Sequence, residues 1–366
     1  MITNNIYIKL LGTISLSIGL VIILFLSSEQ QVHRNNAFTR RYPPHPVNKQ
    51  YDLDIGFNSY YIAGFDRDIL YLGNRTSPWH LLQVNLETKD TSHIQLAPRS
   101  HKLKFRAIKV EVVPPYFFVM DGTMPFILRG EIGEWQADPW MTDQAYFNKA
   151  IPIDSNTIYV RTTHATTHRS TLGLIHKKVG HIKVQLDTTL LQAQIDGVFD
   201  VDGLLVKDPL AKKLGYVYYY RNQFFTMDNT LGSLFRQHTI DTVQRAQLTI
   251  ATKGKSRRTT LAAPPLYINR TAAMSKEFML VLSHRLGRNE SREVLQQASI
   301  IDVYDHNKNT YEFSFYLYDI HKHKVREFAV GQNLIIALID DQLSVYQMID
   351  RYFNATTSIE IKHQTP

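Results

Sequence analysis

The chain has 366 residues, of which 44% are hydrophobic and 20% charged, so it can bury a large core as one β domain or as two ordinary domains. It contains no cysteine, which excludes disulfide bonds, thiolate metal sites, cysteine nucleophiles and a lipid-modified cysteine at the N-terminus. The formal net charge of +8 is spread along the chain, which is more typical of plain solubility than of a nucleic-acid partner, and we expect none.

An apolar segment near the N-terminus predicts a membrane anchor. Leu10 to Leu26 is an uncharged run of 17 residues, close to the roughly 20 that a helix needs to span a bilayer. A cleavable signal peptide is the alternative, but its apolar core is usually about 7 to 15 residues long and ends at small residues. Leu26-Ser27-Ser28 makes a poor cleavage site, so we predict an uncleaved single-pass anchor over residues 1–28.

The orientation of this anchor rests on two opposing indications. Lys9 precedes the span, whereas Arg34, Arg40 and Arg41 follow it, and a positive-inside count would leave the large domain in the cytoplasm. A single apolar segment ahead of a long β domain is most simply an export signal, and long domains can translocate despite nearby charge. We therefore predict a cell inner membrane protein with its large domain in the periplasm.

A polar stretch separates the anchor from the folded sequence. Residues 29–50 include Pro43, Pro44 and Pro46, a composition typical of an extended stalk. Folded sequence is expected from about Tyr51, which defines a second domain over residues 51–366.

The remainder reads as short strands and turns. Ile300 to Leu317 is the clearest hairpin, with alternating apolar positions on both sides of a polar turn at residues 305–309. Its pattern recurs 219 residues earlier, around Leu82 to Leu96. Six strand-turn-strand units spaced by 46, 46, 61, 66 and 44 residues can be placed at Leu82, Leu128, Leu174, Phe235, Ile301 and Val345. This spacing predicts an all-β propeller of about six blades, with a β-sandwich pair as the alternative.

Nearly continuous apolar runs precede these units and predict the inner half of each blade, because strands buried on both faces lack alternation. They are Tyr60–Ala63, Tyr116–Met120, Thr157–Arg161, Tyr216–Tyr220, Phe278–Leu282 and Leu334–Ile339. The segment Ser358 to Lys362 is a candidate to pair with the first blade and close the ring.

Metal, phosphate and catalytic motifs are poorly supported. His164 and His168 fall in strand and loop sequence, and the carboxylates of Asp200-Val201-Asp202-Gly203 fit turn chemistry better than a calcium loop. Lys253 to Arg258 lacks the first glycine of a phosphate-binding loop and reads as an exposed basic loop. The patterns G-x-S-x-G, H-E-x-x-H and a strand-linked G-x-G-x-x-G are absent. We predict no cofactor or metal, and no catalytic residue can be named.

One aromatic patch stands out. The segment from Tyr216 to Phe225 joins stacked aromatic side chains to an arginine, and Asp228 follows it. Such a patch can bind a sugar or planar ligand, which makes Tyr220, Arg221, Asn222 and Asp228 the candidate ligand or partner site. The alternative is a core hairpin that turns at residues 221–223.

Three phrases of the sequence resemble an uncharacterised group of bacterial membrane-anchored proteins. They are NSYYIAGFDRDILYLGN (58–74), FFVMDGTMPFILRG (117–130) and YYYRNQFFTMD (218–228). The resemblance implies a propeller-like, envelope-located protein placed beside redox-associated membrane proteins, and it carries over no catalytic residue. The leading hypothesis is a membrane-anchored propeller that binds a partner protein or ligand in the envelope. The alternative is a hydrolase or lyase on carbohydrate or peptide, with its site in the propeller channel.

Overall fold

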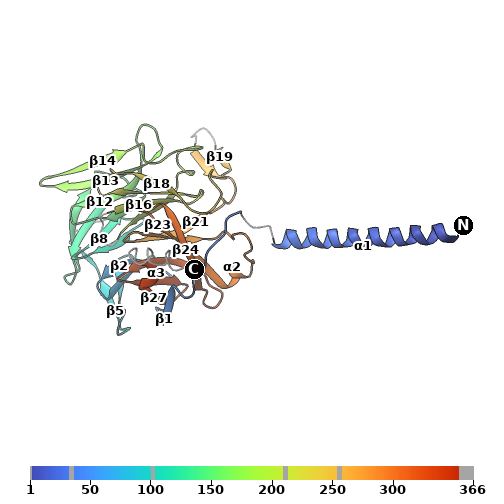
Figure 1. Cartoon of the computed structure of the whole chain (residues 1–366). Coiled ribbons are helices and arrows are strands. Elements are labelled where there is room, and N and C mark those ends of the chain that lie inside the picture. The colour runs from blue at the N-terminus through green and yellow to red at the C-terminus, as the bar shows by residue number, and fades with distance from the viewer. Residues whose placement is uncertain (1, 33–36, 100–103, 209–212, 254–257, 354–366) are drawn as a thin grey trace.

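The computed structural model describes the chain except for residues 1, 33–36, 100–103, 209–212, 254–257 and 354–366. It consists of an N-terminal helix, α1 (Ile2–Val32), and a propeller of six blades, each built on four antiparallel strands, within the described part of the chain (Figure 1). The predicted all-β propeller of about six blades is thereby confirmed.

Each blade runs from an innermost first strand to an outer fourth strand, and the bounds follow. Blade 1 contains β2 (Tyr60–Asp66), β3 (Ile69–Asn74), β4 (His80–Asn85) and β5 (Thr91–Gln95); blade 2 contains β7 (Lys109–Val113), β8 (Tyr116–Asp121), β9 (Phe126–Glu131) and β10 (Gln136–Thr142), with β6 (Ala97–Pro98) at its edge; blade 3 contains β11 (Lys149–Pro152), β12 (Thr157–Thr163), β13 (Ser170–Lys178) and β14 (His181–Asp187). Blade 4 contains β15 (Gly203–Lys207), β16 (Lys213–Tyr218), β17 (Gln223–Asp228) and β18 (Phe235–His238); blade 5 contains β21 (Asn269–Ser275), β22 (Phe278–Ser283), β23 (Ala298–Asp305) and β24 (Thr310–Tyr318); blade 6 contains β25 (Val325–Gly331), β26 (Leu334–Ile339), β27 (Gln342–Met348) and β1 (Val47–Asp54). Outside the blades lie the hairpin β19 (Ile250–Lys253) and β20 (Arg258–Leu261) and the short helices α2 (Val294–Gln297) and α3 (Asp350–Phe353).

The ring is closed by the beginning of the propeller sequence. β1 pairs antiparallel with β27, from Val47 opposite Met348 to Asp54 opposite Gln342, and so supplies the outermost strand of blade 6. Each innermost strand contacts its counterpart in the next blade around the whole ring, including β25 against β2. The predicted closing segment Ser358 to Lys362 lies outside the described residues.

The predicted buried runs occupy the inner half of the blades. Tyr60–Ala63 lies in an innermost strand, and the other five runs lie in or at the end of second strands, such as Leu334–Ile339 in β26. Second strands are packed between the neighbouring blades on both faces, which explains why Leu280 and Ile335 are fully buried. The predicted hairpin Ile300 to Leu317 is β23 and β24 of blade 5, with Val303 opposite Phe313.

Helix α1 is exposed and apolar, whereas residues 37–46, which come after it, pack against the propeller. Its window Lys9–Leu26 has a mean hydropathy of 2.3 and exposed side chains, so it is long and apolar enough for a membrane span, and a signal sequence has the same character. The predicted stalk 29–50 is shorter in the structure, because Phe38 is buried against the propeller and β1 begins at Val47 rather than near Tyr51. We call the packed residues 37–46 the tether.

The connections of the strands divide the propeller into two faces. All innermost strands run in the same direction, so the links from second to third strands and from each blade to the next lie on one face, which we call the long-loop face. These connections are residues 55–59, 75–79, 96–108, 122–125, 143–148, 164–169, 188–202, 219–222, 239–268, 284–297, 319–324 and 340–341. The opposite, short-turn face carries residues 67–68, 86–90, 114–115, 132–135, 153–156, 179–180, 208–212, 229–234, 276–277, 306–309 and 332–333.

Candidate functional site

An axial channel runs between the six innermost strands. Its cavity has a volume of about 380 Å³ and is lined by residues of every blade, most of them in the halves of the innermost strands nearer the short-turn ends. At one point the wall is very tight: a Cβ on Gly64, whose φ is +152°, would lie 2.2 Å from the carbonyl oxygen of Val112. Glycine is therefore required where β2 passes β7.

Several charged side chains line this channel. Lys109 Nζ and Glu111 Oε1 form an ion pair at 2.5 Å, and half of the Lys109 side-chain surface is exposed to the lumen. Burial raises the pKa of Glu327, which Lys109 and Arg75 partly oppose. Burial lowers the pKa of Lys207, whose Nζ donates to the carbonyl oxygen of Pro152 at 2.6 Å. The channel interior thus carries charged groups although much of its wall is apolar, including Phe65, Leu205 and Phe328.

Cations gather at the long-loop end of the channel because of their register on the innermost strands. Lys109 and Lys149 are the first residues of β7 and β11, and Arg270 and Arg326 are the second residues of β21 and β25. Blade 1 adds Arg75 directly after β3, with its guanidinium 5.4 Å from the centre of the Tyr61 ring. We call the channel end formed by these residues, Arg161, Asp202 and Tyr219 the channel mouth.

Lys149 is the centre of a hydrogen-bonded cluster in the channel mouth. Its Nζ donates to the carbonyl oxygen of Gly203 at 2.5 Å and to the Tyr219 hydroxyl at 3.0 Å, and it lies 3.6 Å from Asp202 Oδ1. Burial lowers the pKa of Lys149 to about 8; Asp202 raises it, and the positive charges of Arg161 and Lys109 lower it. A fraction of this amine is therefore neutral near pH 7, unlike an ordinary lysine.

Arg161 supports the same cluster from β12. Its Nη1 pairs with Asp202, and its Nη2 donates to Ser170 Oγ at 3.1 Å. Its buried Nε has no hydrogen-bond partner within the described residues. One donor of the guanidinium thus remains unused beside Asp202, whose side chain is 30% exposed.

Aromatic rings line one side of the mouth. The rings of Tyr219 and Tyr267 are 5.8 Å apart, and the Arg270 guanidinium lies 4.6 Å from the centre of the Tyr267 ring. A guanidinium group held over an aromatic ring keeps its charge and has fewer side-chain conformations. It therefore loses less conformational entropy when it binds an anion. Five cations from different blades and the neighbouring Arg161 are accompanied there by four carboxylates that act on them: Glu111, Asp202, Glu327 and Asp340. The mouth therefore has excess positive charge.

The predicted aromatic patch is only partly brought together. Tyr220, Arg221 and Asn222 form the connection between β16 and β17, but Asp228 is at the far end of β17, where its carboxylate accepts hydrogen bonds from Thr230 and Gly232. The six-residue strand β17 separates the two ends by roughly 17 Å.

The three residues that do meet are buried. Arg221 is 0% exposed, stacks 3.7 Å from the Tyr218 ring centre and donates to the Gln192 carbonyl oxygen at 2.9 Å. Asn222 Nδ2 donates to the Asp241 carbonyl oxygen at 2.5 Å, and burial lowers the pKa of Arg221. A ligand cannot reach these groups on the surface, so the geometry corresponds to the alternative of a core hairpin.

In the aspartate-rich segment, the Asp200 carboxylate is bound by backbone N–H groups of its own turn. The Asp200 carboxylate accepts hydrogen bonds from the backbone N–H groups of Gln194, Ile195, Asp196 and Gly197. Its oxygens therefore serve the turn, as the sequence pattern indicates. Within the described residues, no three histidine or acidic side chains converge as metal ligands.

The mouth residues are missed by a search for local motifs because each blade contributes one or two. Lys109, Lys149, Arg270 and Arg326 are separated by long stretches of sequence, and their strands are less apolar than the second strands. A usable signal exists in retrospect: a cation at the first or second position of four innermost strands.

No family model matches the chain, and no curated protein matches its sequence. Solved structures similar to it include a putative exported protein from Bacteroides fragilis NCTC 9343, with 7% identity, coverage of 86% of this chain and 99% of that chain, and a TM-score of 0.49. Virginiamycin B lyase from Staphylococcus aureus has 11% identity, coverage of 83% and 100%, and a TM-score of 0.47. The β-propeller domain of Cps50 (Swd1) from Myceliophteria thermophila has 9% identity, coverage of 83% and 100%, and a TM-score of 0.42. These likenesses concern the fold and carry no argument about function.

Proposed function

We propose that this protein is a membrane-tethered β-propeller that binds an anionic ligand, free or part of a partner, at its channel mouth. The observation that supports the proposal is the strand register, which places Arg75, Lys109, Lys149, Arg270 and Arg326 of five blades at the same end of the channel. Like charges repel one another, so their grouping lowers stability unless an anion compensates it.

The proposed anion would be held by direct hydrogen bonds. Lys149 and Arg326 provide charged donors at the rim, although Arg326 Nη1 also donates to the Tyr60 carbonyl oxygen at 2.7 Å. Charged hydrogen bonds to anions are about twice as strong as neutral ones. We also propose the partner and the compartment. The partner is a protein or ligand of the envelope, and the propeller lies on the periplasmic side of an inner-membrane anchor.

The test is calorimetric titration of inorganic pyrophosphate into the detergent-solubilised full chain. We expect saturable binding, weakened about tenfold by Lys149→Gln or by Arg326→Gln because each removes a charged hydrogen bond. Lys276→Gln, an exposed lysine on the short-turn face, is the matched control and should bind as the unaltered chain does. Equal weakening by Lys276→Gln, or no pyrophosphate binding, would contradict the proposal.

A second function is favoured by Lys149 itself. An amine with a pKa of about 8 that lies 3.0 Å from a tyrosine hydroxyl can act as a general base, as a hydrolase or lyase on carbohydrate or peptide requires. In a screen of such substrates, turnover should rise with pH through the pKa of Lys149 and disappear in Lys149→Met. Turnover that survives in Lys149→Met would remove this candidate.

A further inference from the structure

The tether joins the propeller on the long-loop face. The Phe38 carbonyl oxygen accepts a hydrogen bond from the Arg288 backbone N–H at 2.7 Å, and Arg288 belongs to the connection 284–297. This connection also contains α2, which Figure 1 shows on the side of the propeller from which the chain leads to α1. From Phe38 the tether crosses blade 5 to Pro46. The next residue, Val47, begins β1 at the short-turn face.

A buried arginine fixes the tether to blade 5. The Arg40 side chain is 0% exposed; its Nε lies 2.6 Å from Asp302 Oδ1, and its Nη1 lies 2.7 Å from Glu290 Oε2. Its Nη2 donates to Ser283 Oγ at 3.0 Å. Burial would lower the pKa of Arg40, but Asp302 and Glu290 outweigh it and raise the pKa. We call Arg40, Ser283, Glu290 and Asp302 the tether clasp.

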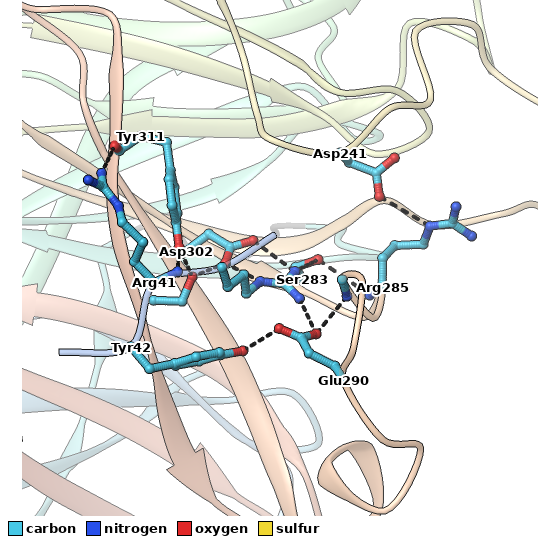
Figure 2. Close-up of polar contacts among 11 residues, drawn as sticks. Arg41, Tyr42, Asp241, Ser283, Arg285, Glu290, Asp302 and Tyr311 are labelled. Carbon is cyan, nitrogen blue, oxygen red and sulfur yellow. Dashed lines mark hydrogen bonds and ion pairs between the residues drawn. The ribbon is translucent and has the colours of Figure 1, made fainter. Parts of the chain in front are cut away.

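The next two tether residues extend the clasp, as Figure 2 shows. Tyr42 donates to Glu290 at 2.7 Å and stacks on Tyr316 with 4.6 Å between ring centres. The Arg41 backbone N–H donates to the Tyr311 hydroxyl at 3.0 Å, and Arg41 Nη2 donates to the Tyr311 carbonyl oxygen at 2.6 Å. The tether is therefore part of the folded propeller and cannot swing as a free stalk.

The covalent distance from the clasp to the anchor is short. Helix α1 ends at Val32 and the packed tether includes Phe38, so six Cα–Cα steps separate them and span at most about 22 Å. A helix that spans a membrane would hold the adjoining edge of the long-loop face within this distance of its own end.

The long-loop face has a net positive charge and the short-turn face a net negative charge, which would favour contact of the long-loop face with a membrane. Counting only described residues of the connections defined above, the long-loop face carries 14 Lys and Arg against 10 Asp and Glu, and the short-turn face carries 4 against 7. The long-loop face also carries the channel mouth. A surface of net positive charge is attracted to the headgroups of anionic lipids.

We infer that the tether clasp holds the long-loop face against the bilayer and that the anion received by the channel mouth is the phosphate headgroup of an anionic lipid. This inference rests on the proposed function, since it identifies the ligand of the same mouth. Most of the predicted basic loop at Lys253 to Arg258, residues 254–257, lies outside the described part of the chain and carries none of the argument.

The absence of cysteine allows a direct test with single fluorophores. Gln144→Cys and Glu134→Cys place one label at each end of β10 in blade 2, on the long-loop and short-turn faces respectively, more than about 20 Å apart. Blade 2 is opposite blade 5, so the label at 144 approaches the membrane only if the whole face does. The labelled full chain is placed in nanodiscs of phosphatidylcholine, with or without phosphatidylglycerol, that contain a headgroup nitroxide quencher.

We expect loss of fluorescence at position 144 and not at 134, a stronger loss when phosphatidylglycerol is present, and a weaker loss after Arg270→Gln with Arg326→Gln. Equal quenching at both positions, stronger quenching at 134, or no effect of phosphatidylglycerol would overturn the inference. If any of these accompanied normal pyrophosphate binding in detergent, the proposed function would stand without a lipid ligand. Failure of pyrophosphate binding would instead count against the proposed function.

Discussion

The two faces of the propeller use their polar side chains in different ways. On the short-turn face these side chains bond to their own turn: Asn85 accepts from Glu87 and Thr88, and Asp305 accepts from Asn307 and Lys308. The long-loop face also contains such turns, as at Asp200, but its channel mouth joins partners from different blades: Lys149 donates to the Tyr219 hydroxyl, 70 residues away. The tether clasp is similar, because Arg40 and Asp302 are 262 residues apart. Polar groups in the short turns therefore stabilise local structure, whereas the mouth and the clasp depend on the assembled ring.

The largest expected effect comes from the tether clasp. Arg40→Met removes the cation that compensates Asp302, which is 2% exposed, and we expect a loss of about 3–5 kcal/mol in the free energy of unfolding. Urea unfolding of the full chain in detergent measures this loss.

A double variant separates the charge from the packing of Arg40. Arg40→Met with Asp302→Asn removes both charges and should recover part of the stability, because no uncompensated carboxylate remains. If Arg40→Met alone unfolded at the urea concentration of the unaltered chain, the tether would not be a fixed part of the propeller.

A smaller effect is expected on the short-turn face. Asp305→Ala leaves the backbone N–H groups of Asn307 and Lys308 without their acceptor and should cost about 1–3 kcal/mol. Burial raises the pKa of Asp305, but bonds from Lys308 and Asn307 outweigh it and lower the pKa, so its contribution is present above about pH 4 and is lost as the pH falls further. Unfolding at pH 7 and pH 3 measures both effects.

Pyrophosphate binding provides the contrast between the faces. Asp305→Ala should leave it unchanged, because residue 305 is not on the long-loop face. Weaker binding by this variant would show that the faces are not functionally separate.

The lowered pKa of Lys149, a residue of the channel mouth, predicts that the stability of the protein depends on pH. Its pKa is about 8 in the folded protein against an ordinary 10.5, so the unfolded chain binds more protons between these values and stability rises with pH across that window. The difference in unfolding free energy between the unaltered chain and Lys149→Met, taken at pH 7.5 and pH 10, isolates this rise. A difference that is the same at both values would mean that Lys149 titrates normally.

The smallest effect is expected from an exposed ion pair outside both the mouth and the clasp. Lys49 and Asp52 are 2.7 Å apart, with side chains 38% and 36% exposed, so Lys49→Ala should change stability by about 0–1 kcal/mol. This variant calibrates urea unfolding for the other substitutions. A loss as large as that of Arg40→Met would show that burial does not distinguish the two ion pairs.

Local sequence patterns predict much of the architecture. The apolar run in α1, the hairpin of β23 and β24 and the six-unit spacing follow from short-range alternation and turn residues, which need no partner from another blade. The same reasoning places the most apolar runs in the inner half of the blades, because burial on both faces selects such residues.

The candidate site depended on tertiary structure. Local sequence could not show that Arg221 points into the core, that Arg40 is bound by blade 5, or that Lys149 meets Asp202 and Tyr219. Each of these outcomes depends on contacts between segments that are distant in sequence, and chain connectivity alone does not specify them. The sequence by itself determined the N-terminal apolar helix and the repeated strands; closure of the ring decided which charges are buried, which are paired and which surround the channel.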